Sequence, residues 1–359
     1  MSLRRPNLAP SSLPRATQIV KRSVGEICGA AVLHVRQEGN VVAEAAFGEL
    51  YPHGEPVTID SIFDLASVTK VFAGTGLLAL FDRRRLSLDD PIVARLPEFS
   101  GLDDRRARVT YRHLLTHTSG LPAHVNFRDA LGAPTVIARV CATPLQAAPA
   151  TEIIYSDLGF MLVGEAISRI HGQPLDAAVA KLVCEPLGSG AVYRPSGESL
   201  ERVVCTENDA WRRRLLRGEV HDENCWAMGG VAGHAGLFGT AGDVAALAEM
   251  YREGGSVGHA RLLSRATVRE ATREQAAGPD ERRGLAWALR ASDQHSSGSR
   301  FSSESYGHTG YTGTSVWVDP QRALTVVLLT NRVLLDRNPE PIRSLRAAVH
   351  DAVVEDLEG

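Results

Sequence analysis

Apolar positions near the two ends of the chain follow the short, turn-separated pattern of strands. Residues 29–48 read GAAVLHVRQEGNVVAEAAFG, in which two apolar runs flank a turn at Glu38-Gly39-Asn40. Residues 306–332, YGHTGYTGTSVWVDPQRALTVVLLTNR, predict a second set of strands that turns at Asp319-Pro320. Both ends of the chain therefore contribute strands.

Between these ends the apolar spacing is helical. Residues 157–172, DLGFMLVGEAISRIHG, predict an apolar helix ended by Gly172, and residues 174–188 predict another that starts at a proline. A closing helix is expected over residues 340–357. The pattern predicts an α/β (α+β) fold, with an antiparallel sheet built from both chain ends, flanked by helices, and an inserted all-helical lobe. We expect residues 1–80 and 236–359 to form the sheet lobe and residues 81–235 the mainly helical lobe.

Composition excludes several classes of protein. The 359 residues are 44% hydrophobic and 23% charged with a formal charge of −3, which gives no indication of nucleic acid as a partner. Five scattered cysteines without a C-x-x-C pair argue against a disulfide framework and a zinc ribbon. No apolar run reaches the roughly 20 residues of a membrane span. The first 14 residues lack the apolar stretch of a signal peptide, so we expect a cytoplasmic location for the sequence as given, or a periplasmic or exported one if a leader was removed.

Lysine is rare in this chain, and one lysine has a distinctive place. Only three of the 39 basic residues are lysines, and Lys70 follows Ser67 by three positions in DLASVTK (residues 64–70). Arginine stays protonated in proteins, whereas a desolvated lysine can lose its proton. The extended segment before Ser67 and the apolar helix after it predict Ser67 at a strand-to-helix junction, with Lys70 on the same helix face.

Two further short motifs follow SVTK (67–70) along the chain, first YSD (155–157) and then HTG (308–310). This ordered set resembles the serine β-lactamase and penicillin-binding-protein superfamily, in particular its class C-like branch, which includes esterases, D-aminopeptidases and peptidoglycan hydrolases. Similar segments cover nearly the whole chain, including SIFDLASVTK, LSLDDPIVARLPEF, LLTHTSGLP, GGVAGHAGLFGTAGD and GHTGYTGTSVWVDP. The resemblance implies a β-lactamase/transpeptidase-like fold with the active site in the cleft between its lobes, and no cofactor.

The resemblance also implies a role for each motif. Ser67 would be the nucleophile of an acyl-enzyme, activated by Lys70 and Tyr155 as a coupled proton-accepting unit. Burial is expected to disfavour the ammonium form of Lys70. The backbone N–H groups of Ser67 and Tyr311 would form the oxyanion hole, and Gly310 would let the strand approach the substrate closely.

Two departures from the family pattern concern the substrate. His308 stands where β-lactam-active members have lysine, and Asp157 stands where they have asparagine. A neutral histidine anchors a substrate carboxylate poorly, and Asp157 is expected to add a negative charge. We therefore expect a small ester or a peptide-like amide as substrate, cell-wall fragments among the candidates, with weak or no β-lactamase activity.

Other signals leave alternatives open. His113 and His117 have the i, i+4 spacing of a metal pair, but no acidic residue lies between them, and we expect no metal. The glycine-flanked segment 221–238 offers Asp222, Asn224 and His234 as candidate contacts at the rim of the active site. The alternatives to a serine hydrolase are a non-catalytic muropeptide- or penicillin-binding module of the same fold and a metal-dependent hydrolase.

Overall fold

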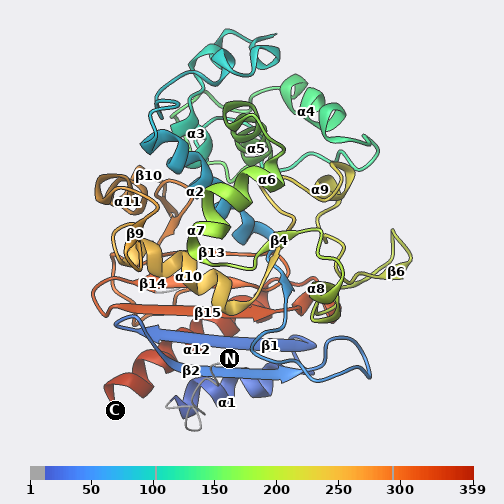
Figure 1. The fold of residues 1–359 in the computed structure, drawn as a ribbon, viewed down its shortest axis with the longest axis vertical. Coiled ribbons are helices and arrows are strands. Elements are labelled where there is room, and N and C mark those ends of the chain that lie inside the picture. The colour runs from blue at the N-terminus through green and yellow to red at the C-terminus, as the bar shows by residue number, and fades with distance from the viewer. Residues whose placement is uncertain (1–12, 102, 293–294) are drawn as a thin grey trace.

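The computed structural model describes residues 13–101, 103–292 and 295–359 (Figure 1). Residues 1–12, on which the expectation about a leader mostly rests, lie outside the described residues. One antiparallel sheet runs in the spatial order β10 (Ala276–Ala277), β11 (Arg282–Arg283), β12 (Ala288–Leu289), β13 (Tyr306–Thr309), β14 (Ser315–Asp319), β15 (Leu324–Thr330), β1 (Ala30–Gln37) and β2 (Asn40–Gly48). Because β1 pairs with β15, the sheet is built from both chain ends, as the sequence predicts.

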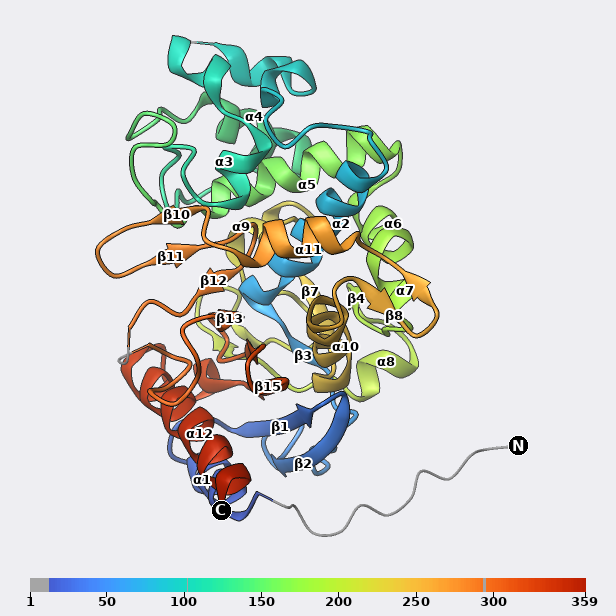
Figure 2. The ribbon, with the colours of Figure 1, turned by 90° about the vertical axis from the view of Figure 1, so that its left-hand side faces the viewer.

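Alternation along the strands gives this sheet two buried faces. In β15, Val326 and Leu328 pack in one apolar cluster, whereas Val327 and Leu329 pack in another. The first cluster is covered by α1 (Pro14–Ser23) and α12 (Glu340–Glu358), which lie side by side in Figure 2. The opposite face packs against α10 (Ala241–Arg252), so helices flank the sheet on both sides as expected.

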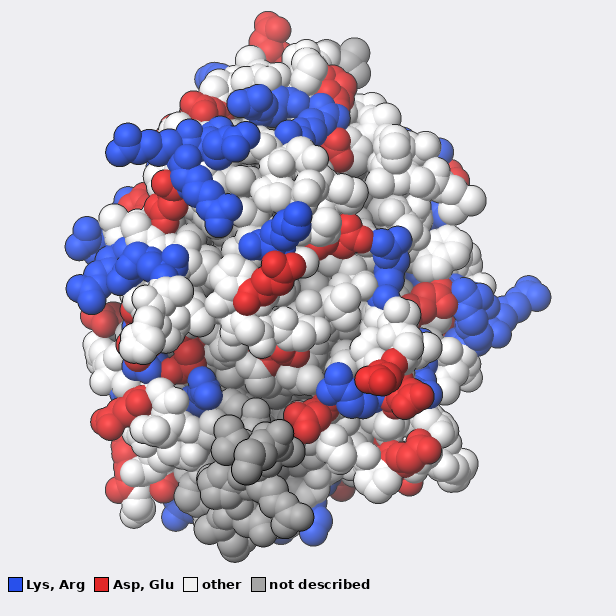
Figure 3. Space-filling model, viewed as in Figure 1, with Lys and Arg blue, Asp and Glu red and all other residues white. Residues whose placement is uncertain are grey.

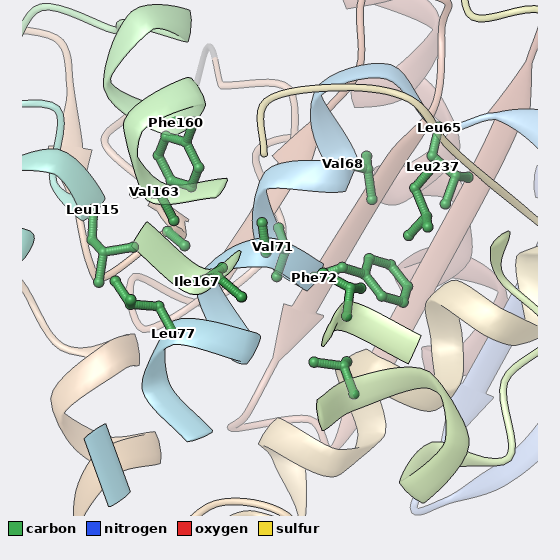
Figure 4. Close-up of a cluster of buried hydrophobic side chains, with 14 of the residues drawn as sticks. Leu65, Val68, Val71, Phe72, Leu77, Leu115, Phe160, Val163, Ile167 and Leu237 are labelled. Atoms are coloured by element: carbon green, nitrogen blue, oxygen red, sulfur yellow. The ribbon is translucent and has the colours of Figure 1, made fainter. Parts of the chain in front are cut away.

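The helix that follows Ser67 lies at the centre of the molecule. This helix, α2 (Thr69–Asp82), is mainly apolar and buried on all sides from Thr69 to Leu80, and it packs against α5 (Asp157–His171). Figure 4 shows side chains of both helices in one cluster, among them Val71, Phe72, Phe160 and Ile167. Each large apolar side chain buried in this way contributes about 2 kcal/mol, so the position of the segment carrying Ser67 is firmly determined.

The region between residues 81 and 235 contains helices and a few short strands. The expected helix over residues 174–188 is divided into α6 (Leu175–Val179), the π-helical turn η5 (Ala180–Cys184) and α7 (Glu185–Leu187). Pro186 has no N–H to donate to the preceding turn, which accounts for the irregular hydrogen bonding there. The other helices here are α3 (Tyr111–Leu115), α4 (Ala133–Ala142), α8 (Glu198–Glu201) and α9 (Glu223–Ala227), with 3₁₀ turns η2 (Ile92–Ala94), η3 (Pro97–Ser100) and η4 (Asp104–Arg108).

Three small sheets complete the fold. The first joins β3 (Phe63–Asp64), β7 (Leu237–Gly239) and β4 (Val192–Tyr193), and so connects the segment before Ser67 to the middle of the chain. The others are β5 (Asn208–Asp209) with β6 (Arg214–Leu215) and β8 (Ser256–Val257) with β9 (Ala260–Arg261); α11 (Arg265–Thr272) and the 3₁₀ turn η6 (Arg332–Leu334) are the remaining helical elements. The division into lobes at residues 80 and 236 stays a prediction.

The surface agrees with the balanced composition. On the face drawn in Figure 3, basic and acidic side chains are interspersed over the surface. Among the described residues, no helix has both the length and the apolar character that crossing a bilayer requires.

Candidate active site

Ser67 lies in a tight turn between β3 and α2. This turn, η1 (Ala66–Val68), begins with Ala66 at a φ of 46°, a left-handed conformation that is unfavourable for a residue with a side chain. The Asp64 carboxylate stabilises the conformation because its Oδ1 accepts a hydrogen bond of 2.9 Å from the Ala66 N–H. The structure thus places Ser67 at the predicted strand-to-helix junction.

Lys70 is completely buried beneath Ser67. Its Nζ donates hydrogen bonds to Ser67 Oγ at 2.8 Å and to the His234 carbonyl at 3.2 Å. Asp157 Oδ1 lies 2.7 Å from the same nitrogen, and the centre of the Tyr155 ring lies 4.9 Å from it. The three residues of the predicted catalytic unit are therefore together, and Asp157 joins them.

The ion pair with Asp157 changes the expected charge of Lys70. Burial lowers the pKa of Lys70, but the charges of Asp157 and Tyr155 raise it more, and the pKa lies above its ordinary value. Burial raises the pKa of Asp157, but Lys70 and His124 lower it by more. The pKa therefore lies below its ordinary value, and Asp157 stays a carboxylate. Lys70 is an ammonium in this state, which differs from the neutral amine that the sequence led us to expect.

Asp157 is not the free negative charge that the sequence suggested. It is the first residue of α5, whose N-cap Ser156 accepts a hydrogen bond from Gly159 N–H at 3.2 Å. Besides Lys70, it faces His124, with 3.8 Å between His124 Nδ1 and Asp157 Oδ2. The carboxylate raises the pKa of His124. Sequence reasoning missed His124, because nothing distinguishes it from other polar residues that follow a turn.

Tyr155 lies between two histidines. The centre of its ring is 4.5 Å from that of His117 and 6.0 Å from that of His308. His117 is buried and its Nδ1 accepts a hydrogen bond of 2.9 Å from Ser156 N–H. His113 accepts from Thr110 N–H at the start of α3. Both histidines of the i, i+4 pair thus hold backbone in place, and the described residues contain no group of three or more side chains arranged to bind a metal.

The HTG strand, β13, ends against the turn that carries Ser67. A Cβ on Gly310 would lie 2.1 Å from Thr314 Oγ1 and 2.7 Å from the Leu65 carbonyl, so only glycine fits there. Thr314 Oγ1 in turn donates to the Leu65 carbonyl at 3.0 Å. This close approach brings the Tyr311 backbone, just after Gly310, next to the Ser67 turn.

His308 is buried, and burial together with the charges of Lys70 and Arg283 holds its pKa well below the ordinary value. Its Nδ1 lies 2.9 Å from the Thr309 carbonyl oxygen, and the lowered pKa favours a neutral ring, in agreement with the expected absence of charge. It lines a second cavity of about 810 Å³ and does not line the one that contains Ser67.

The Ser67 cavity has a volume of about 450 Å³ and is lined by most of the predicted site. Of the rim candidates, Asp222 lines it, whereas Asn224 and His234 do not. Asn224 is buried and tethers the chain near His124: its Oδ1 accepts from Phe127 N–H at 2.7 Å. His234 Nε2 is 2.9 Å from Asp222 Oδ1. His221 and Glu223, which belong to the glycine-flanked segment noted in the sequence, also line it, whereas the charged or titratable lining residues that sequence reasoning missed are His124, Arg332, Arg337, Arg343 and Arg346.

Comparisons with known proteins identify the family and the fold. The family model described as Beta-lactamase matches residues 17–350. A relative from Escherichia coli (strain K12) described as "Putative D-alanyl-D-alanine carboxypeptidase" is 33% identical over 305 residues, which cover 77% of this chain and 70% of the relative. A relative of the same description from Salmonella agona (strain SL483) is 30% identical over 84% of this chain and 78% of its own.

Solved structures show the same fold at lower identity. A penicillin-binding protein homolog from Caulobacter crescentus superposes with a TM-score of 0.77 at 20% identity, covering 98% of this chain and 99% of its own. EstCE1, described as a hydrolase with promiscuous acyltransferase activity, has a TM-score of 0.74 at 23% identity, covering 94% and 98%. The chain therefore belongs to the beta-lactamase family, and it is a serine hydrolase of this fold.

Proposed function

We propose that this protein hydrolyses a small ester or a peptide-like amide through an acyl-enzyme formed on Ser67. The observation that carries the proposal is the contact of 2.8 Å between the buried Lys70 Nζ and Ser67 Oγ, at the wall of a cavity. A serine hydroxyl becomes a nucleophile only when a neighbouring group takes its proton, and Lys70 is in direct contact with this hydroxyl.

Lys70 and Tyr155 act as one proton-accepting unit in this proposal. Because Asp157 and Tyr155 both lie beside Lys70, we assign the proton of Ser67 to the Lys70–Tyr155 unit as a whole and not to either residue alone. Ser67 Oγ bonds to the substrate carbonyl carbon while its proton passes to this unit. The proton then goes to the leaving alcohol or amine, and water attacks the acyl-enzyme with the same unit as base, so that a carboxylic acid is released.

The backbone N–H groups of Ser67 and Tyr311 are the proposed oxyanion hole. Within the described residues, neither amide donates a hydrogen bond to another backbone carbonyl, so both are free to donate to a substrate oxygen. Removing one such donor from an oxyanion hole typically costs about 100-fold or more in turnover. Gly310 supports this role because it is what allows Tyr311 to lie beside the Ser67 turn.

The relatives' descriptions favour a peptide-like, cell-wall-derived substrate, and the esterase-like neighbour favours an ester. We retain the class C-like assignment and a weak or absent β-lactamase activity as parts of the proposal. We also propose the two-lobe division at residues 80 and 236. The cavity combines Ser67 and Gly310 from the first lobe with Tyr155 and Asp222 from the second, as expected for a cleft between lobes.

A substrate panel tests the proposal against its alternatives. Short p-nitrophenyl esters, D-alanyl peptides and a chromogenic cephalosporin are assayed with the wild type and Ser67→Ala, with and without a chelator. We expect hydrolysis of an ester or peptide, little turnover of the cephalosporin, complete loss in Ser67→Ala, and no effect of the chelator. Activity that survives Ser67→Ala, or that the chelator removes, would contradict a serine mechanism. Binding without turnover of any substrate would favour the non-catalytic module.

A further inference from the structure

His124 lines the Ser67 cavity, yet the reaction proposed above gives it no role. About half of its side chain is exposed, and its Nδ1 faces Asp157. The other histidine of the lining, His221, has its Nε2 2.7 Å from Glu207. Within the described part of the chain, His124 Nε2 makes no hydrogen bond with another protein group. One ring nitrogen of His124 is therefore available to a molecule in the cavity.

The backbone beside His124 is fixed by the start of α5. Ser156 Oγ donates to the Pro122 carbonyl at 2.6 Å, and the Asp157 N–H donates to the Ala123 carbonyl at 3.0 Å. Both donors belong to the YSD motif, which also carries the tyrosine of the proposed proton-accepting unit. The same short segment thus positions His124 and the reacting groups relative to one another.

Asp157 determines which nitrogen of the His124 ring is available. Its Oδ1 lies 2.7 Å from Lys70 Nζ, and its Oδ2 lies 3.8 Å from His124 Nδ1. A carboxylate favours a proton on the nitrogen that faces it, so the neutral ring carries its hydrogen on Nδ1 and keeps the lone pair of Nε2 as an acceptor. Asp157, and more weakly Asp222 and Glu223, raise the pKa of His124 against the opposite effect of burial. Nε2 is an acceptor above that pKa, where the ring is neutral.

The second step of the proposed reaction has a use for such an acceptor. The water that attacks the acyl-enzyme has two hydrogens, and only one of them passes to the Lys70–Tyr155 unit. An acceptor for the other hydrogen fixes the direction in which the water oxygen approaches the acyl carbon, and a fixed approach accelerates the attack. An alcohol has a single hydroxyl hydrogen, which passes to the unit, so an alcohol does not need this acceptor.

We propose that His124 is a further catalytic residue, which holds the hydrolytic water by accepting one of its hydrogens at Nε2, and this rests on the proposed acyl-enzyme of Ser67. The water oxygen bonds to the acyl carbon while its other proton moves to the Lys70–Tyr155 unit. The bond between Ser67 Oγ and the acyl carbon then breaks, and the unit returns that proton to Ser67 Oγ. The products are a carboxylic acid and the restored serine, and His124 neither gains nor loses a proton. His124 thus favours water over an alcohol as the acceptor of the acyl group.

The test compares the fate of the acyl group in the wild type and in His124→Leu. p-Nitrophenyl acetate is the acyl donor, and intact mass spectrometry follows the formation of the acetyl adduct and its decay after the ester is removed. In a second measurement methanol competes with water, and chromatography gives the ratio of methyl acetate to acetate. This ratio reports only on protein that reacts, so a partly unfolded variant does not change it. His124→Gln, which keeps a polar acceptor, is the second variant, and His259→Leu, at an exposed position, is the matched control.

We expect the adduct to form in His124→Leu at nearly the wild-type rate and to decay about tenfold more slowly, the size of one hydrogen bond. The ratio of methyl acetate to acetate should rise by a similar factor, with His124→Gln between the two and His259→Leu equal to the wild type. An unchanged product ratio, or an equal slowing of adduct formation and decay, would overturn the role of His124 and leave the acyl-enzyme in place. A wild-type protein that forms no adduct would instead overturn the proposed function of Ser67, and the role of His124 with it.

Discussion

The Ser67 cavity has two walls that treat charge in opposite ways. On the side of α5 and α9, Lys70 is paired with Asp157 at 2.7 Å and His234 with Asp222 at 2.9 Å. On the side of α12, the buried Arg346 donates to two backbone carbonyls and has no carboxylate within 4.0 Å among the described residues. The first wall is balanced by the protein itself, whereas the second is left positive.

The difference separates two tasks of one cavity. Groups that exchange protons in a reaction need fixed partners that set their position and protonation state beforehand, and Lys70 has three such partners. The wall on the side of α5 and α9 thus holds the groups proposed for the reaction, whereas the wall on the side of α12 adds unpaired positive charge to the cavity. The predictions below test this contrast.

The largest effect is expected at Lys70. Lys70→Arg keeps the positive charge but removes the amine that contacts Ser67 Oγ, and a guanidinium does not fit the same buried position. We expect turnover of an activated ester to fall by roughly 10³-fold or more, nearly as far as in Lys70→Ala. Lys181→Arg, at an exposed position, is the matched control. If Lys70→Arg kept most of the activity, Lys70 would be a packing or electrostatic residue only.

The next effect concerns stability, and it contrasts the two walls directly. Asp157→Asn leaves the Lys70 ammonium buried without its counter-charge, which should lower the free energy of unfolding by about 3 kcal/mol at pH 7. The pKa of Asp157 is lowered by folding, so the pair stabilises the protein at neutral pH and this contribution is lost as the pH falls into the acidic range.

Two comparisons decide whether that loss comes from the pair. The double variant Lys70→Met/Asp157→Asn should be more stable than Asp157→Asn alone, because it removes both charges. Arg343→Gln, on α12 at the other wall of the cavity, should change stability by less than about 0.5 kcal/mol, because Arg343 and its partner Glu340 are both exposed. Urea unfolding followed by circular dichroism measures all of these values. Equal losses on both walls would remove the contrast.

A smaller effect is expected in the pH dependence of the reaction. Asp157 raises the pKa of Lys70, so Asp157→Asn should let Lys70 lose its proton at lower pH. The profile of kcat/KM against pH for a neutral ester should move to lower pH by about one unit. Asp129→Asn, an exposed change, should leave the profile in place. A profile unchanged in Asp157→Asn would mean that the carboxylate does not control the protonation of the unit.

The smallest effect is expected at Asn224, which supports the rim of the cavity without lining it. Asn224→Ala removes the hydrogen bonds of 2.7 Å from Phe127 N–H and of 2.8 Å to the Val125 carbonyl, which hold the chain next to His124. We expect a loss of about 1–2 kcal/mol in stability and a KM raised a few-fold with kcat nearly unchanged. A large fall in kcat would show instead that Asn224 takes part in the reaction.

The order of motifs in the sequence was enough to predict much of this molecule. Strand-like runs at both ends predicted the sheet that joins β1 to β15. The Ser-x-x-Lys spacing placed Ser67 and Lys70 on one face at a strand-to-helix junction, and the structure has them in contact. These features depend on local periodicity and on segments whose positions the surrounding core determines.

The charge state of the site could not be predicted in the same way. Whether Lys70 is neutral depends on Asp157, which is distant in sequence and reaches Lys70 only because α5 packs against α2. The direction of the Arg346 side chain likewise depends on how α12 lies on the sheet, and nothing in its local sequence distinguishes it from the exposed Arg343. The side chain of Asn224 points inward and accepts a hydrogen bond from the Phe127 backbone, and that of His234 points inward to Asp222. Residue type alone does not reveal these orientations.

The most direct test of the central claim is the identity of the residue that becomes acylated or phosphonylated. The protein is incubated with a fluorophosphonate, its intact mass is measured, and the modified peptide is mapped by fragmentation. We predict one adduct per chain on Ser67, absent from Ser67→Ala and much slower to form in Lys70→Arg. An adduct on one of the buried cysteines or on another serine, or no adduct under conditions that label a related hydrolase, would contradict the account.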